Sequence, residues 1–300
     1  MSFTRTKSGL SNLGIFYGSD LIIFTEGGKK SFTKEEVEAG QYNTISIDIK
    51  FWKSVLEAHG LERTVSFRAV GSKTCSKSIC EKIITGQAKN IAVAKDSDLD
   101  EFLGLKQRSP YILYTKGYSW ENDVFSKDLV SEQIESLALL DNIPDEISKL
   151  IEQCYSDYEN VGTRLAKLEI IFRKHGIKFI SEFNGERFIN SKSKPKINIQ
   201  QVKQLIDQNK EKIQRPVSLP PGTKICAYTN IYGKLLESLA FAVICFISKK
   251  YLQIKDIPKE IIGISMLEKY KNKITAHPDT YYTQIVSELN SAKNLQKGHQ

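Results

Sequence analysis

The stretch Ile91-Ala92-Val93-Ala94-Lys95-Asp96-Ser97-Asp98-Leu99-Asp100 combines two features that decide how this chain is interpreted. Its first four residues form a continuous apolar run, which is typical of a strand buried on both faces of a parallel sheet. Three carboxylates at alternate positions follow, where the strand meets solvent. Such carboxylates repel one another unless a cation or a base shares the site, and divalent cations prefer oxygen ligands. The pattern favours a metal site at the end of a buried strand.

A second acidic signal lies upstream, after another apolar run. Leu21-Ile22-Ile23-Phe24-Thr25 reads as a buried strand, and Glu26-Gly27-Gly28 follows it. Open α/β sheets place their ligands at the carboxyl ends of parallel strands. We therefore expect Glu26 and the aspartates at 96, 98 and 100 to share one metal at that edge.

Two other interpretations of the aspartates can be compared with this one. A calcium-binding EF-hand loop starting at Asp96 would need Gly at position 6 and Glu at position 12, where this chain has Glu101 and Gln107. The segment before Asp96 is also strand-like, so the EF-hand interpretation fails. A solvated acidic turn without a ligand stays open.

Length and composition indicate a globular protein. Three hundred residues, 40% of them hydrophobic and 26% charged, suffice for one large or two modest domains. The longest apolar run, Leu239–Ile247, is too short to span a bilayer, and we interpret it as a core helix. The start of the chain has no signal-peptide pattern. The five cysteines form no CxxC pair, which favours reduced thiols in a cytoplasmic protein over disulfides or a zinc site (75, 80, 154, 226 and 245).

The charge balance adds a hint about partners. The net charge is +8, with an isoelectric point near 9.0. Residues 173–215 hold eleven Lys and Arg against four Asp and Glu. A basic surface together with a metal-holding acidic pocket is what hydrolysis of a phosphodiester polymer needs. In the alternative interpretation, these lysines form only the solvated faces of helices and a loop.

The order of predicted elements indicates an α/β domain over residues 1–130, with a mostly parallel sheet flanked by helices. A mainly helical, basic domain over residues 131–300 follows, in which we expect Asn190–Lys196 to be a mobile basic loop. The predicted strands are Leu21–Thr25, Thr64–Val70, Ile91–Ala94 and Tyr111–Tyr114, and the first predicted helices are Ile49–Leu56, with Asp48 as its N-cap, and Ser76–Thr85. Later helical periodicity covers Glu132–Leu140, Ile147–His175, Ile199–Ile213, Tyr232–Tyr251 and Met266–Thr275.

Four short motifs resemble those of a known family. They are Thr25-Glu26-Gly27, Asp96–Asp100, Tyr118-Ser119-Trp120-Glu121-Asn122 and, more weakly, Tyr232-Gly233-Lys234-Leu235-Leu236. The chain resembles the Toprim-like nucleases, and among them the effector subunits paired with ABC-type ATPases in bacterial antiphage systems of the PARIS type. Relative to that family, residues 29–46 look like an insertion. We interpret it as a hairpin that carries partner or substrate contacts.

The resemblance implies roles for individual residues. Glu26 would act as general base or acid, or as a metal ligand. Asp96 and Asp98 would hold Mg²⁺ or Mn²⁺, with Asp100 as a further ligand or a supporting group. Glu121 would complete the acidic site, or would only place a negative charge at a helix N-terminus. Lys73 or Lys77 would neutralise charge on the phosphate, unless both are surface lysines.

The resemblance also implies a biological setting. It implies a toxic endoribonuclease that favours tRNA over DNA, is silenced by an ABC-type ATPase sensor subunit, and dimerises on release to cause abortive infection. Composition cannot separate tRNA from DNA.

Two rival functions remain. One is a non-catalytic nucleic-acid-binding or adaptor protein with a vestigial acidic site. The other is a topoisomerase- or primase-like Toprim enzyme, for which zinc ligands and space are lacking. No GxxxxGK[ST] phosphate-binding loop occurs, so we do not expect the chain itself to hydrolyse ATP. His59, His175, His277 and His299 are isolated in the sequence, which favours surface or capping roles.

Overall fold

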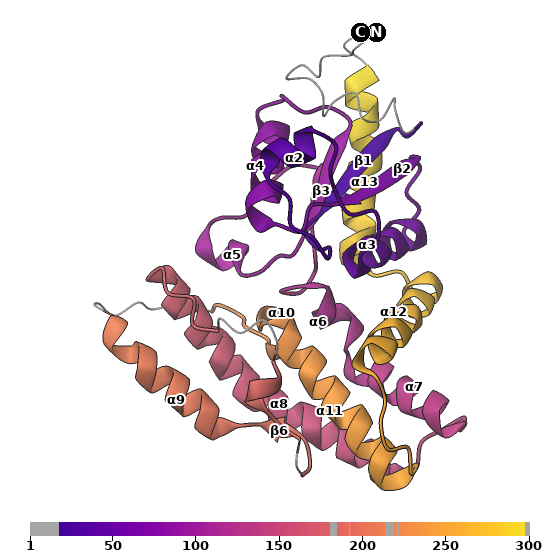
Figure 1. The fold of residues 1–300 in the computed structure, drawn as a ribbon, viewed down its shortest axis with the longest axis vertical. Helices are drawn as coiled ribbons and strands as arrows, with labels where there is room; N and C mark the ends of the chain where they lie inside the picture. Colours follow the sequence, from indigo (N-terminus) through magenta and orange to yellow (C-terminus); the bar gives the residue numbers. More distant parts are fainter. Residues whose placement is uncertain (1–17, 181–184, 192, 214–218, 221, 298–300) are drawn as a thin grey trace. The chain divides into compact units, whose positions relative to one another are not determined.

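The computed structural model describes residues 18–180, 185–191, 193–213, 219–220 and 222–297, whose path is shown in Figure 1. The chain divides into two compact units. Unit 1 comprises residues 1–96, 107–115 and 271–300, and unit 2 comprises residues 97–106 and 116–270. The sequence predicts one boundary near residue 130, whereas this division passes four times from one unit to the other.

Unit 1 is built around a four-stranded sheet in which every pairing is parallel. The strands lie in the order β2 (Val65–Ala69), β1 (Leu21–Thr25), β3 (Ile91–Lys95) and β4 (Ile112–Tyr114). Every residue of β1 is buried, which accounts for the uninterrupted apolar sequence of that strand. The predicted α/β class with a parallel sheet is confirmed.

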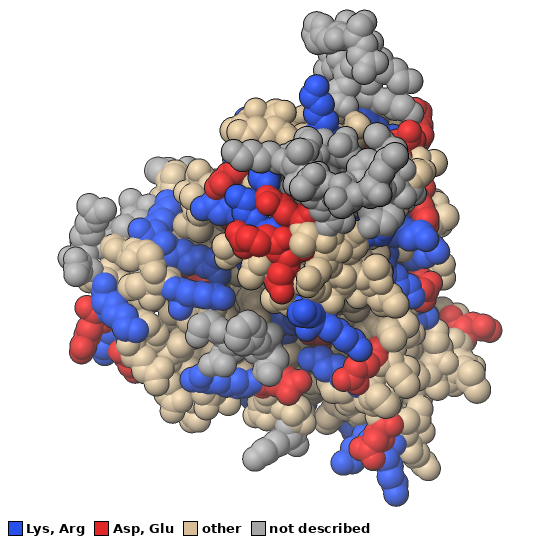
Figure 2. Space-filling view, turned by 45° about the horizontal axis from the view of Figure 1, so that its top comes forward, with Lys and Arg blue, Asp and Glu red and all other residues tan. Residues whose placement is uncertain are grey.

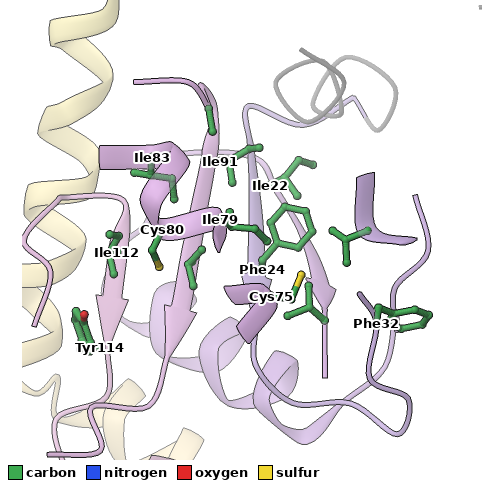
Figure 3. Packing of buried hydrophobic residues seen from close by; sticks show 14 residues of the cluster. Ile22, Phe24, Phe32, Cys75, Ile79, Cys80, Ile83, Ile91, Ile112 and Tyr114 are labelled. Atoms are coloured by element: carbon green, nitrogen blue, oxygen red, sulfur yellow. The ribbon is translucent and has the colours of Figure 1, made fainter. Parts of the chain in front are cut away.

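One face of the sheet packs against α4 (Lys73–Ile84) and α2 (Lys34–Glu38). Figure 3 shows Ile22 and Phe24 of β1 pointing toward Cys75 and Ile79 of α4. Phe32 and Val37 complete this layer. The helix α4 begins at an N-cap, Ser72, whose hydroxyl accepts the amide hydrogen of Cys75. The sequence predicts this helix over Ser76–Thr85, and it begins three residues and ends one residue before those bounds.

The opposite face requires a second layer, because alternate residues of β1 such as Leu21 and Ile23 are also fully buried. Helices α3 (Ile47–Ala58) and α13 (Thr280–Lys297) supply it. The Tyr282 ring of α13 lies edge-on to Phe51 and Trp52 of α3, with centroids 6.2 and 6.0 Å apart. The last helix therefore belongs to the sheet domain, although its sequence follows the helical region.

Residues 29–46 differ from the predicted hairpin. They contain the short helix α2, which has a capping box at Thr33, and they continue to an antiparallel bridge between Asn43 and Ala69 at the edge of β2. The helix α3 begins directly after this segment, where the hydroxyl of Ser46 accepts the amide hydrogen of Ile49. The prediction of Asp48 as N-cap is also wrong, since Asp48 lies in the first turn.

Unit 2 is mainly helical. Its longest element is α8 (Asp145–Lys174), whose inner side buries Tyr155, Tyr158 and Ile170. The other elements are α5 (Asp100–Leu103), α6 (Trp120–Val124), α7 (Lys127–Ala138), η1 (Glu186–Phe188), β5 (Ile189–Asn190), β6 (Lys196–Ile197), α9 (Ile199–Asn209), η2 (Lys210–Lys212), α10 (Ala227–Asn230), α11 (Gly233–Tyr251) and most of α12 (Lys259–Ala276). The predicted helical C-terminal region is confirmed.

Two smaller predictions also have outcomes. The Asn190–Lys196 segment connects β5 to β6, which pair antiparallel, and residue 192 lies outside the described residues. Leu239–Ile247 forms part of the buried face of α11, as predicted for a core helix. Within the described part of the chain, no helix combines the length and apolar character needed to cross a membrane.

Candidate active site

The strand order of unit 1 indicates one candidate ligand site, at the edge of the sheet between β1 and β3. The connection after β1 leads to its neighbour β2, whereas the connection after β3 leads in the opposite direction, to β4. Between β1 and β3 the topology therefore switches direction. In open α/β sheets, the crevice at the carboxyl ends of two such strands is where ligands bind. The residues that follow β1 and β3 are Glu26 and Asp96, the two carboxylates that the sequence places at this edge.

Glu26 is held firmly at the end of β1. Thr25 pairs with Ala94 in the parallel register, which brings Glu26 level with Lys95. The Ser76 hydroxyl of α4 donates a 2.6 Å hydrogen bond to Oε1 of Glu26, and Nζ of Lys95 lies 4.0 Å from the same oxygen. Only 9% of Glu26 is exposed. A carboxylate with this little solvent needs such partners to stay ionised.

Lys95 is a site residue that sequence reasoning missed. Its side chain is 14% exposed, and its ammonium group lies 5.4 Å from the ring centroid of Tyr114 on β4. The Coulomb attraction to Glu26 and the cation–π contact both favour the charged lysine. The only signal in the sequence was a single lysine that interrupts an apolar strand just before Asp96. Lys73, which the sequence favoured, is instead the exposed first residue of α4.

Asp48 is a second residue that the sequence did not assign to the site. A Cβ atom at Gly27 would lie 1.8 Å from Oδ2 of Asp48, so the carboxylate packs against the turn that follows Glu26. A larger residue at position 27 would therefore push the Asp48 side chain away from this turn. Asp48 can take this position because Ser46 caps α3 in its place. Twenty residues separate Gly27 from Asp48 in the sequence, but the fold places the two residues next to each other.

Asp98 and Asp100 belong to unit 2, where their backbone is fixed by neighbours in that unit. The amide of Asp98 donates to the carbonyl of Tyr118 at 2.8 Å, and Asp98 has a left-handed φ of 45°. Asp100 begins α5. Between them, Leu99 is buried against Tyr118 and Ile170. The loop is thus anchored by Leu99, while Asp98 and Asp100 remain half-buried.

An ion-pair network continues from Tyr118. The guanidinium group of Arg173 donates to the Tyr118 hydroxyl at 2.7 Å and to the carboxylate of Glu169. Burial raises the pKa of Glu169, and Arg173 opposes that shift. Burial would lower the pKa of Arg173, but Tyr118 and Glu169 outweigh it and raise the pKa. The backbone amide of Ile180 donates to the second Glu169 oxygen at 2.7 Å. This network therefore positions Tyr118, whose backbone carbonyl accepts the hydrogen bond from the amide of Asp98.

Glu121 is the second residue of α6, and the structure pairs it with a lysine. Its side chain is buried, and Oε1 lies 2.6 Å from Nζ of Lys234 at the start of α11. Burial would lower the pKa of Lys234, but Glu121 and Glu237 outweigh it and raise the pKa above 10.5. Glu121 and Lys234 come from the two motifs Tyr118–Asn122 and Tyr232–Leu236, so these distant motifs form one cluster.

The remaining contacts of that cluster involve a glycine and an asparagine. A Cβ at Gly233 would meet the Ser119 hydroxyl at 2.1 Å, so a larger residue there would displace that side chain. The amide of Asn122 donates to the backbone carbonyls of Tyr228 and Ile231 at 2.7 and 3.1 Å. The two motifs therefore lock α6 against the start of α11.

The oxygen donors of Glu26 and Asp96 are of the type that Mg²⁺ and Mn²⁺ bind. In unit 1 they stand at the same sheet edge. Asp98 and Asp100 follow in unit 2. Among the residues that the structure describes, no group of three or more His, Cys, Asp and Glu side chains is arranged to hold a metal ion. All five cysteines are free thiols, three of them buried.

No family model matches this chain, and none of the curated proteins matches it either.

Proposed function

We propose that this protein is a metal-dependent endoribonuclease of Toprim-like type. The observation that carries the proposal is the position of Glu26, a nearly buried carboxylate at the switch point of a parallel sheet, beside Lys95. A nearly buried carboxylate next to a lysine, at the edge where α/β folds bind ligands, suits proton transfer at a phosphate ester. The basic composition of the chain suits a polyanionic substrate.

The proposed roles follow from these contacts. Ser76 orients Glu26, which takes or gives a proton at the reacting oxygen. Lys95, rather than the exposed Lys73, supplies positive charge to the phosphate. Glu26 and Asp96 would hold Mg²⁺, and the sequence adds Asp98 and Asp100 as further ligands. The bound metal would polarise the phosphate and lower the pKa of water.

Glu121 has a different role in this account. Its carboxylate is already paired with Lys234, so it stabilises the cluster that joins α6 to α11. We therefore assign it to the support of unit 2 and not to the acidic site.

The biological part of the proposal rests on the family resemblance. The resemblance suggests a toxic effector of bacterial antiphage defence, with tRNA as the favoured substrate. It also suggests an ABC-type ATPase as the silencing partner, and a homodimer as the active form. The four motifs and the basic charge are the observations that support it.

One observation favours an alternative. Lys95 already supplies a cation to Glu26, as it would in a protein whose acidic site no longer binds metal. In that case the chain would be a nucleic-acid-binding or adaptor protein without catalytic activity.

The test is cleavage by the purified chain, without partner, of total tRNA and of plasmid DNA. It is run with Mg²⁺, with EDTA, and with Glu26→Ala and the double variant Asp96→Ala/Asp98→Ala. The proposal expects metal-dependent cleavage of tRNA that both variants lose. Cleavage of DNA alone would overturn the substrate. Tight RNA binding with no cleavage and no uptake of metal would support the adaptor alternative.

A further inference from the structure

A cavity of about 670 Å³ lies within unit 2, along one side of α11. Its floor is formed by positions three or four residues apart, which lie on one stripe of the helix. The opposite wall comes from the segment around β5. The lining residues are Ser238, Phe241, Ala242, Cys245, Phe246, Lys249 and Lys250 of α11 with Glu186, Ile189, Ser191 and Lys255. Its volume is in the range of pockets that bind small molecules or single nucleotides.

The floor of the cavity is apolar and aromatic. Phe241 and Phe246 are both half-buried, so part of each ring stays accessible. Ile189, from the opposite wall, is buried at 8% exposure. Burial raises the pKa of the Cys245 thiol, and nearby Asp256 acts in the same direction. A planar aromatic group can therefore stack on this floor, and Cys245 is a neutral thiol there.

The rim of the cavity is cationic. Three lysines line it against one carboxylate, and that carboxylate, Glu186, lies 3.3 Å from Lys259. The ammonium group of Lys250 contacts the Tyr251 hydroxyl at 2.9 Å. Lys249 and Lys255 are exposed, and neither has an ion-pair partner among the described residues. The rim thus presents two ammonium groups to an anion.

We infer that this cavity binds one nucleotide of a single-stranded RNA segment. The base stacks on Phe241 or Phe246, and the flanking phosphates contact Lys249 and Lys255. Aromatic floors with cationic rims bind single strands in this way, largely without sequence preference. The inference rests on the proposed function, because it takes RNA as the ligand, but it concerns binding at α11 and not the chemistry at Glu26.

The surrounding charge favours a strand over a free nucleotide. Residues 173–215 belong to the same unit, and exposed lysines among them, such as Lys174, Lys196 and Lys203, supply sites for phosphates beyond the cavity. Figure 2 shows Lys and Arg side chains spread over much of the face that it draws, with Asp and Glu in smaller groups among them. A strand can use several of these cations at once, and each neutralised phosphate releases a counterion.

The test uses the full chain carrying Glu26→Gln, so that RNA is bound but not cut. A twelve-nucleotide oligouridine with one 5-iodouridine is crosslinked by light, and the modified peptide is identified by mass spectrometry. The affinity of the same RNA is measured by fluorescence anisotropy. It is measured for Lys249→Glu/Lys255→Glu and for a control, Lys149→Glu/Lys167→Glu. The control changes the net charge equally, at two exposed positions of α8 that lie outside residues 173–215.

We expect the crosslink in the α11 peptide that contains Phe241 and Phe246. We also expect the cavity variant to weaken binding about tenfold, against about twofold for the control. Equal weakening by both variants, or crosslinks only in other peptides, would overturn the inference. The inference would also be overturned if 5-iodouridine monophosphate labelled the α11 peptide and the oligonucleotide did not.

The failure of this inference differs from the failure of the proposed function. If the chain without the Glu26 substitution cuts RNA but no label appears on α11, only the inference falls. If label appears on α11 but the chain cuts no RNA, only the nuclease proposal falls.

Discussion

The ammonium group of Lys234 lies 2.6 Å from Oε1 of Glu121, and this contact joins two motifs that are far apart in the chain. Glu121 is 3% exposed, so removal of the lysine would leave this carboxylate buried without that cation. The lysine side chain, in contrast, is 35% exposed and keeps part of its hydration. Loss of this contact would therefore cost more free energy for the buried carboxylate than for the partly exposed lysine.

We predict that Lys234→Met destabilises the protein by about 2 kcal/mol. Removing the lysine leaves a buried carboxylate without its cation, and the partial exposure of Lys234 keeps the cost below that of a fully buried pair. Adding Glu121→Gln to Lys234→Met should recover part of the loss. Denaturant unfolding of the four proteins measures the coupling, and additive losses would contradict the predicted interaction.

The same pair gives a pH dependence with a definite sign. The folded-state pKa of Lys234 is raised above 10.5, so the folded state retains a proton that the unfolded chain loses. The stabilisation is complete below pH 10.5 and is lost as the pH rises through the folded-state value. Above pH 10.5, wild-type protein should therefore lose stability more steeply than Lys234→Met does.

Two glycines should respond in opposite ways to alanine. At Gly233 a Cβ would lie 2.1 Å from the Ser119 hydroxyl, whereas at Gly263 of α12 nothing lies within 4 Å. We predict that Gly233→Ala destabilises by about 1–3 kcal/mol through overpacking. Gly263→Ala should stabilise by about 0.5–1 kcal/mol, because alanine favours a helix. Thermal melting of both variants tests this, and a stable Gly233→Ala would mean that the two motifs do not pack closely.

Lys95 should matter more for cleavage than the lysines of α4. We predict that Lys95→Ala lowers the rate of RNA cleavage about a hundredfold, because a preorganised charge at the phosphate is lost. The exposed residues Lys73 and Lys77 provide matched controls, and their alanine variants should stay within about twofold of wild type. A large loss in Lys73→Ala with a small one in Lys95→Ala would reverse the assignment.

Asp98 combines a charge with an uncommon backbone conformation. Asparagine tolerates the left-handed φ of 45° about as well as aspartate does, so Asp98→Asn should fold with unchanged stability. If the carboxylate is a metal ligand, the same variant should lose cleavage about a hundredfold. Asp141→Asn, an exposed acid in unit 2, is the control. Full activity of Asp98→Asn would remove Asp98 from the proposed ligands.

Much of the sheet could be predicted from the sequence because its strands are buried on both faces. The runs Leu21–Phe24 and Ile91–Ala94 are apolar without interruption, and both lie in strands of the predicted sheet. Helices α8 and α11 begin and end close to their predicted bounds, since long amphipathic periodicity is a strong signal. The edge of the sheet where Glu26 and Asp96 stand follows from these strands.

The remaining features depend on contacts between distant residues, which local patterns do not encode. Nothing near Tyr282 indicates that α13 packs on α3. The sequence predicts Asp48 as the helix cap, but Ser46, two residues earlier, takes that role. The contact of Lys95 with Glu26 could not be predicted locally, because it depends on the parallel register that places the two residues level with each other. Glu121 and Lys234 were noticed separately, and only the fold joins them.

The most direct test of the central claim is the rate of tRNA cleavage by Glu26→Gln as Mg²⁺ is titrated. Glu57→Gln, an exposed glutamate of α3 in the same unit, is the matched control. The account predicts that Glu26→Gln lowers the rate about a thousandfold at every Mg²⁺ concentration, while the control cleaves like wild type. Cleavage by Glu26→Gln at the wild-type rate would contradict the assignment of the active site to the end of β1.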